Sequence, residues 1–374
     1  MRVKRLLILF ICLLCLLFAS CEAATEDFSA ASSADETIPD NKAASHFIQP
    51  GYASNQLHVI WDMKIWDGCL YIGAGDFDKN HSPGVARRYR FETNEWESCG
   101  TIPDEQIGRF IVLENQLMIP GFDPTEDWSL GNYYVLEEDR FITHRVFPNG
   151  IHCFDLRLYD HQFFAALGVS AGNMPVVSTG NNENFQPVPL IGPDGTPLST
   201  KGYTEVRAYD LLTIGDTLYA IVRLDENLQA YKYDNGSFVY HSDLRYKLVG
   251  SAISYLPVIE KAVLSGTAFL TTGRLYCTEN MDAFADITPD GIDVVADLLV
   301  YNDTLYLLGN TKTDHGYMLS VLQYNSDCTF ETVKTVSSDL LSQSFAYDGE
   351  YWYIAIGEMS DLNHKDSGKI LCLS

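Results

Sequence analysis

Aspartate recurs at regular intervals along this chain, where carboxylates could meet and bind a polar ligand. A short turn motif recurs seven times. The position six residues before the second residue of each turn, called the recurring position, is occupied by Asp62, Arg109, Asp155, Asp210, Tyr255, Asp297 and Gln343. Four of these are Asp and none is aliphatic, whereas the next residue is nearly always apolar. Carboxylates around one axis repel unless a cation, an arginine or ligand hydroxyl groups lie between them. We therefore predict a polar site for a sugar or a cation.

Counter-charges lie close to these carboxylates in sequence. Lys64 stands two residues after Asp62, and Arg157 stands two residues after Asp155. His152 stands three residues before Asp155. The predicted ligand-binding residues are Asp62, Arg109, His152, Asp155, Arg157, Asp210, Tyr255 and Asp297. The alternative is structural, because Asp at a junction between a loop and a strand commonly accepts backbone N–H groups.

Three kinds of glycoside or acyl chemistry fit parts of this set, and whether the chain is an enzyme stays open. A sialidase-like site would use arginines such as Arg109, Arg157 and Arg207 with Tyr255 as the nucleophile, but no Glu occupies the recurring position. Two neighbouring Asp residues could act as the acid and base of a glycosidase. His152 and Asp155 could form a base and its orienting group, but no Gly-x-Ser-x-Gly motif accompanies them. No catalytic residue is assigned.

Metal binding has weak support in the sequence. The segment 76–80 begins like a calcium loop, with Asp76, Asp78 and Asn80, but His81 replaces the required Gly. No Cys-x-x-Cys or Cys/His cluster indicates zinc. We therefore predict no metal ligands and no cofactor, with calcium as the alternative. Disulfide pairing stays open for six cysteines, which are Cys69, Cys99, Cys153, Cys277, Cys328 and Cys372.

The elements that must position these residues are short strands in a repeat. The second turn residues are 68, 115, 161, 216, 261, 303 and 349, with spacings of 47, 46, 55, 45, 42 and 46 residues. Each copy has an apolar strand on both sides of the turn, a third strand with alternating aromatics and a fourth after a polar turn. Four-stranded units of this length predict an all-β, seven-bladed β-propeller over residues 46–374. The last copy lacks a fourth strand, so we expect an N-terminal strand, near 46–50 or 57–60, to close it.

Several turns resemble those of known propellers. The segment 89–96, Tyr-Arg-Phe-Glu-Thr-Asn-Glu-Trp, resembles the kelch turn. The segments 325–330 and 178–185 resemble degenerate Asp-boxes of sialidase-like blades, with Phe330 and Phe185 in place of Trp. The resemblance implies a kelch or sialidase-like propeller, and because these turns shape the blades, it implies fold more than activity.

The N-terminus predicts export. Residues 1–20 have a basic start and an apolar run too short to span a membrane, and the sequence before Cys21 resembles a bacterial lipobox. We expect lipidation at Cys21, with ordinary secretion as the alternative. Residues 21–45 are small, polar and acidic, which predicts a flexible tether.

Composition narrows the function further. The net charge of −25 excludes nucleic acid as a partner, because a phosphate backbone requires clustered Lys and Arg. We predict a monomeric extracytoplasmic protein, attached to the membrane through its lipid only. Its expected function is to bind carbohydrate through an acidic mouth at the central channel. The alternatives are a scaffold that docks an envelope protein and a sialidase-like or other glycoside-processing enzyme.

Overall fold

The computed structural model describes residues 46–48, 59–75, 84–170, 172–179, 185–244, 260–357 and 364–374. The chain divides into two compact units, residues 1–42 and 43–374, and the description concerns the second. The predicted signal segment, Cys21 and the whole predicted tether, residues 21–45, therefore lie outside the described residues. Within those residues no helix is long and apolar enough to cross a membrane.

The second unit is built from sheets in which nearly all neighbouring strands are antiparallel, and five of these sheets have four strands each. In chain order the first contains β2 (Ile60–Trp66), β3 (Cys69–Ala74), β4 (Gly84–Arg90) and β5 (Glu95–Ile102). The next contains β7 (Ile111–Leu113), β8 (Gln116–Pro120), β10 (Leu130–Glu137) and β11 (Arg140–Pro148). Two later sheets are β21 (Glu260–Leu264), β22 (Thr267–Thr271), β23 (Leu275–Thr278) and β24 (Ala285–Asp286), and β25 (Val294–Tyr301), β26 (Thr304–Thr313), β27 (Gly316–Tyr324) and β28 (Phe330–Ser338). The fifth joins β29 (Ser342–Tyr347), β30 (Trp352–Ile356) and β31 (Lys369–Leu373) to β1 (His46–Ile48).

The remaining strands form one sheet of 11 strands. It contains two antiparallel runs: β12 (Gly150–Tyr159), β13 (Gln162–Val169), β14 (Val176–Thr179) and β15 (Gln186–Pro187), and β17 (Val206–Ile214), β18 (Thr217–Leu224), β19 (Asn227–Asp234) and β20 (Ser237–Asp243). The runs are joined where β13 pairs with β17 over two residue pairs. Three short strands complete the sheet: β6 (Asp104–Gln106), β9 (Phe122–Pro124) and β16 (Leu190–Ile191).

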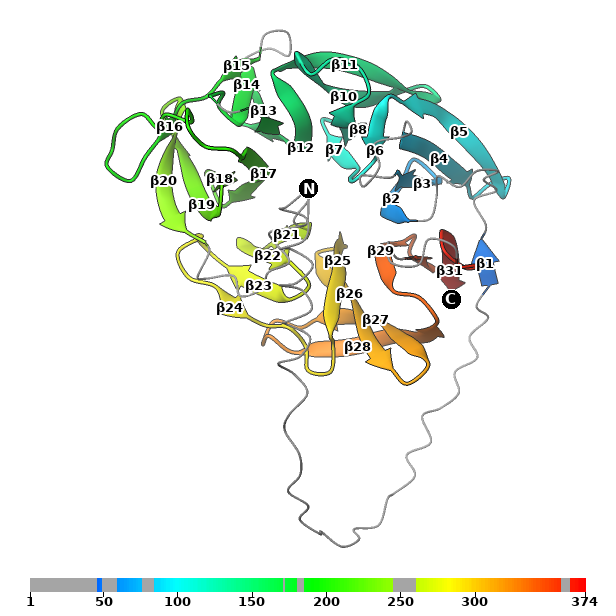
Figure 1. The fold of residues 1–374 in the computed structure, drawn as a ribbon. Coiled ribbons are helices and arrows are strands. Elements are labelled where there is room, and N and C mark those ends of the chain that lie inside the picture. Colours follow the sequence, from blue (N-terminus) through cyan, green and yellow to red (C-terminus); the bar gives the residue numbers. More distant parts are fainter. Residues whose placement is uncertain are drawn as a thin grey trace, which may run out of the picture. The chain divides into compact units, whose positions relative to one another are not determined.

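The sheets surround a common centre (Figure 1). The strands nearest to it, called the inner strands below, are β2, β7, β12, β17, β21, β25 and β29. This arrangement confirms the prediction of an all-β propeller. Two-residue turns join inner strands to second strands, as at Asp67–Gly68 and Asn302–Asp303. Both residues of these turns have positive φ, between 44° and 69°, as in the type I′ turns that match the twist of hairpin strands. Asn, Asp and Gly adopt that conformation most easily, which is why the turns recur visibly in the sequence.

A β-bulge precedes the recurring polar position on several inner strands. The pairing register shifts just before Asp62, Asp155, Asp210 and Asp297. A bulge leaves one residue unpaired and reorients the side chains after it. The bulge on β29 falls between Ser342 and Ser344, so Ser344 is the counterpart of these aspartates. The sequence assignment of Gln343 to this position was wrong, because the following turn is two residues longer than in the other hairpins.

The turn assigned to the fifth copy was also wrong. Glu260 and Lys261 lie inside β21, and the turn is formed by Ser265 and Gly266, between the paired residues Leu264 and Thr267. Counting back from the true turn places Glu260, and not Tyr255, at the recurring position. Tyr255 itself lies outside the described residues.

The core lies between the sheets, where aromatic side chains pack edge to face. Phe164, on β13, is fully buried, and its ring lies 5.0 Å from that of Tyr233 and 6.1 Å from that of Phe238, both in the neighbouring run. Burying one such side chain contributes about 2–3 kcal/mol. All six cysteines of this unit are unpaired thiols, and four of them, Cys69, Cys99, Cys153 and Cys372, are buried.

Candidate functional site

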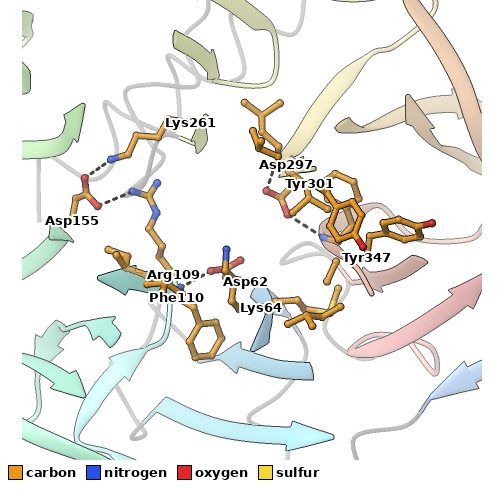
Figure 2. A pocket seen from close by; sticks show the side chains of 18 of the residues that line it. Asp62, Lys64, Arg109, Phe110, Asp155, Lys261, Asp297, Tyr301 and Tyr347 are labelled. Atoms are coloured by element: carbon orange, nitrogen blue, oxygen red, sulfur yellow. Dashed lines mark hydrogen bonds and ion pairs between the residues drawn. The ribbon is translucent and has the colours of Figure 1, made fainter. Parts of the chain in front are cut away.

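A cavity of about 430 Å³ lies at the centre of the unit. Five of the predicted site residues line it: Asp62, Arg109, Asp155, Arg157 and Asp297 (Figure 2). The lining extends from the recurring positions toward the C-terminal ends of the inner strands, through residues 62–65, 109–112, 297–301 and 345–347. The cavity therefore extends toward the face that carries the two-residue turns.

The aspartates at the recurring position, called the ring aspartates below, accept hydrogen bonds from the backbone of the next sheet or run. Asp62 Oδ2 accepts from Phe110 N at 2.5 Å, and Asp155 Oδ2 accepts from Leu211 N at 2.9 Å. Asp297 Oδ2 accepts from Phe345 N at 3.0 Å. In each case the donor is the residue that follows the next recurring position along the chain, which for Asp155 lies in the second run of the same sheet.

Ser344 makes the same connection without a carboxylate. Its Oγ accepts a hydrogen bond from Met63 N at 3.1 Å and donates one to Asp297 Oδ2 at 2.8 Å. These hydrogen bonds connect each sheet or run to the next one, and they are made by Asp62, Asp155, Asp297 and Ser344. This is the structural role that the sequence left open as an alternative for the aspartates.

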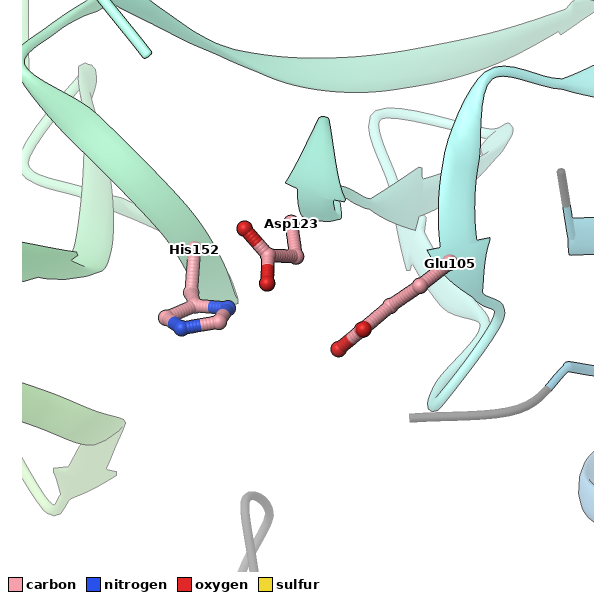
Figure 3. Close-up of side chains that lie close together, drawn as sticks. All are labelled: Glu105, Asp123 and His152. Carbon is pink, nitrogen blue, oxygen red and sulfur yellow. The ribbon is translucent and has the colours of Figure 1, made fainter. Parts of the chain in front are cut away.

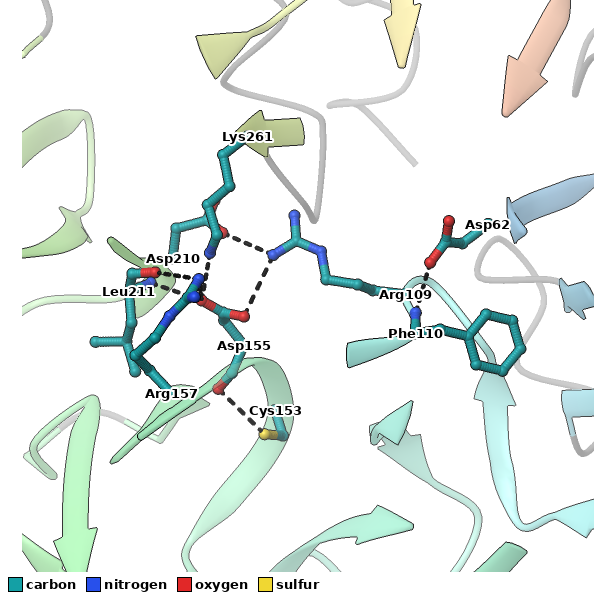
Figure 4. Close-up of polar contacts among 9 residues, drawn as sticks. All are labelled: Asp62, Arg109, Phe110, Cys153, Asp155, Arg157, Asp210, Leu211 and Lys261. Carbon is teal, nitrogen blue, oxygen red and sulfur yellow. Dashed lines mark hydrogen bonds and ion pairs between the residues drawn. The ribbon is translucent and has the colours of Figure 1, made fainter. Parts of the chain in front are cut away.

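Two of the aspartates also belong to a buried ion network (Figure 4). Arg109 Nη1 lies 2.8 Å from Asp210 Oδ1 and 3.5 Å from Asp155 Oδ1. The ammonium group of Lys261 contacts both carboxylates, and Arg157 Nη2 lies 3.8 Å from Asp155 Oδ2. Burial raises the pKa of Asp155, but the charges of Lys261, Arg157 and Arg109 outweigh burial and hold that pKa below its usual value.

The cavity wall carries more cations than carboxylates. Lys64, Arg109, Arg157 and Lys261 line it, against Asp62, Asp155 and Asp297. Asp210 lies behind this wall and is fully buried. The cavity therefore differs from the acidic mouth expected for a chain of net charge −25. Lys261 was not among the predicted site residues, because its position had been assigned to a turn. Ser265 and Gly266, which form the turn, are residue types that favour turns more strongly.

Two of the cations retain hydrogen-bonding capacity. The side chain of Lys64 has no hydrogen bond or ion pair among the described residues, whereas its backbone pairs with Tyr71 of β3. Arg157 Nη2 donates to Leu211 O at 3.1 Å, but its Nε is buried without a partner in the described part of the chain. Four aromatic residues complete the wall: Phe110, Tyr301, Phe345 and Tyr347. The rings of Tyr301 and Tyr347 lie 5.0 Å apart in an edge-to-face arrangement.

His152 lies outside this cavity and has no hydrogen bond to Asp155 among the described contacts. Its ring stacks on Phe154 at 5.2 Å and faces Glu105 and Asp123 (Figure 3). Burial, together with the nearby charge of Arg207, lowers the pKa of His152 to about 3, so the imidazole is neutral. The base-and-orienter pair considered from the sequence is therefore absent from the described contacts.

The described residues contain two groups of side chains that could hold a metal ion. Glu105, Asp123 and His152 form the first, and Asp339, His364 and Asp366 form the second, which is more exposed. The calcium-like segment 76–80 lies outside the described residues.

No protein-family model matches the chain, and no curated protein matches it significantly. Among solved structures, a chain of the mitotic checkpoint complex gives a TM-score of 0.52 at 13% identity, covering 94% of this chain and 99% of that chain. A proposed 6-phosphogluconolactonase from Bacteroides uniformis gives a TM-score of 0.50 at 13% identity, covering 78% and 90%. Virginiamycin B lyase from Staphylococcus aureus gives 0.49 at 7% identity, covering 88% and 98%. The first two support the β-propeller fold, and at such low identity none of the three indicates a function.

Proposed function

We propose that this chain is an extracytoplasmic binding protein whose central cavity takes a small acidic saccharide. The observation that carries this proposal is Arg157, whose Nε is buried without a partner among the described residues, beside a cavity that Lys64 also lines. Guanidinium and ammonium groups bind carboxylates strongly. Aromatic walls such as Tyr301 and Tyr347 supply the apolar surface that ligand sites combine with a few polar groups. A volume of about 430 Å³ lies in the range of small-molecule sites.

Binding fits the geometry better than hydrolysis does. A glycosidase needs one carboxyl group with a raised pKa as its general acid. The pKa of Asp155 is lowered instead, and Asp62 and Asp297 each accept a hydrogen bond from a backbone N–H group. Asp155 is thus a poor proton donor, and Lys64 and Arg157 are the groups left to contact a ligand.

We further propose that the ring has seven blades and that an N-terminal strand closes it. The five four-stranded sheets and the two antiparallel runs of the 11-stranded sheet support that number. The antiparallel pairing of β1 with β31, from His46↔Cys372 to Ile48↔Ile370, supports the closure. The kelch and sialidase-like turns, the lipid at Cys21 and the membrane location are proposed on the sequence alone.

The binding proposal is tested by titrating the purified protein with glucuronate, galacturonate, N-acetylneuraminate and neutral glucose in a calorimeter. We expect at least one acidic sugar to bind and glucose not to bind. Arg157→Gln and Lys64→Gln should each weaken binding about tenfold or more, which corresponds to about 1.4 kcal/mol. Lys232→Gln, on the exposed surface of β19, is the matched control and should bind like the wild type.

Two results would contradict the proposal. One is the absence of binding by every acidic sugar, which would direct attention to an envelope protein as the partner. The other is binding that the Arg157 and Lys64 variants leave unchanged, which would place the ligand outside the central cavity.

A further inference from the structure

A second polar cluster, apart from the central cavity, lies where the short strands β6 and β9 meet the start of β12. Glu105 comes from β6, Asp123 from β9 and His152 from the start of β12, and these strands are neighbours in the 11-stranded sheet. One potential ligand atom from each residue lies within 4.8 Å of the other two. The imidazole and both carboxylates are turned toward one another (Figure 3).

The strand register places the two carboxylates directly opposite each other. β6 and β9 pair through Asp104↔Pro124 and Gln106↔Phe122, so Glu105 faces Asp123 across the ladder. Like charges at such a position destabilise a sheet. A cation between the carboxylates would remove the repulsion.

His152 provides an independent indication of a ligand. Its Nδ1 atom is buried and has no hydrogen-bond partner among the described residues. Buried polar atoms are seldom left unsatisfied, and each exception calls for an explanation such as an ion. The ring is held in place by Phe122 and Phe154, whose centroids lie 6.3 Å and 5.2 Å from its own.

Arg207 is a cation whose charge acts on both His152 and Asp123. Its Nε pairs with Glu205 Oε1 at 3.1 Å, so its charge is shared with a carboxylate outside the cluster.

We propose that Glu105, Asp123 and His152 bind a divalent transition-metal ion such as Zn²⁺. Imidazole nitrogen with carboxylate oxygens is a donor set that suits zinc and related first-row ions, whereas calcium prefers oxygen ligands alone. Three protein ligands leave a position for water, as in open zinc sites. The ion would join β6 and β9 to β12, the strand that carries Asp155 into the central cavity. This site was not predicted from the sequence, because its three ligands lie on separate strands and are far apart along the chain.

The test is metal binding by the full chain after treatment with a chelator. Elemental analysis should find about one equivalent of Zn²⁺ per chain after reloading and removal of excess metal. Zn²⁺ should also raise the melting temperature, because it binds the folded state, whereas Ca²⁺ should have little effect. His152→Asn and Asp123→Asn should each reduce the affinity at least about tenfold. Asp123→Asn preserves the size of the side chain and serves as the test if His152→Asn does not fold.

The matched control is His364→Asn, which removes the imidazole of the other cluster, Asp339, His364 and Asp366. It should bind Zn²⁺ like the wild type. The proposal is overturned if the wild type binds no Zn²⁺, if the His152 and Asp123 variants bind it unchanged, or if His364→Asn alone abolishes binding. None of these readouts depends on the sugar, so failure here is distinct from failure of the proposed function.

Discussion

Lys261 is the cation on which the buried carboxylates of the ring depend most directly. Its ammonium group contacts both Asp155 and Asp210, whose side chains are 1% and 0% exposed. Replacing it with Met keeps the length and apolar stem of the side chain but removes the charge. Breaking a buried ion pair from one side costs about 3–5 kcal/mol, because the partner charge stays buried. Arg109 still contacts both carboxylates, so we expect a loss near the lower limit, about 3 kcal/mol.

The measurement is the midpoint of urea unfolding, followed by tryptophan fluorescence and circular dichroism. Lys261→Met should lower the midpoint strongly, and adding Asp210→Asn should restore part of the loss, because one buried charge is then gone. Lys232→Met, on an exposed position of β19, should change the stability by less than about 0.5 kcal/mol. This prediction is contradicted if Lys261→Met is as stable as the wild type, or if adding Asp210→Asn does not raise the stability of Lys261→Met.

Three further predictions concern other parts of the same unit. Ser344→Ala should cost about 1–2 kcal/mol in urea unfolding, because Met63 N loses its acceptor, and Ser344→Thr, which keeps the hydroxyl, should recover part of that loss. Stability should fall as the pH drops below about 4, because the pKa of Asp155 is lower in the folded protein than in the unfolded chain. The stability that this carboxylate contributes is lost as the pH falls through its pKa in the folded protein, and Asp155→Asn should flatten this part of the pH profile. A thiol reagent should label exposed Cys328 first in the native protein, and Cys328→Ser should abolish this fast phase, whereas burial raises the pKa of Cys99 to about 12 and should make it slow.

The sequence could predict the architecture because turns with positive φ restrict residue type. Pairs such as Asp67–Gly68 and Asn302–Asp303 recur at the inner hairpins and reveal the repeat. The same periodicity located Asp62, Asp155, Asp210 and Asp297 at equivalent positions. What these carboxylates bind was not predictable, because their partners are backbone N–H groups in the next sheet.

The errors in the predicted site have local causes. Ser344 was missed because a bulge and a longer turn shift the last hairpin by one residue. Lys261 was missed because its strand was assigned to a turn, and that assignment also placed Tyr255 in the ring. The partners of His152 come from two other strands, β6 and β9, whose positions depend on tertiary pairing.

The pairing of β1 with β31 has a consequence for how the chain acquires its structure during synthesis. His46 is synthesised long before its partner Cys372, so these two strands cannot pair until residues 369–373 have left the ribosome. Until then β1 is an unpaired strand, and contacts this distant in sequence form slowly. A chain that lacks residues 369–373 would leave β1 without its partner and β30 with an open edge, which is a template for aggregation. β31 therefore protects two strand edges at once, one from each end of the described residues.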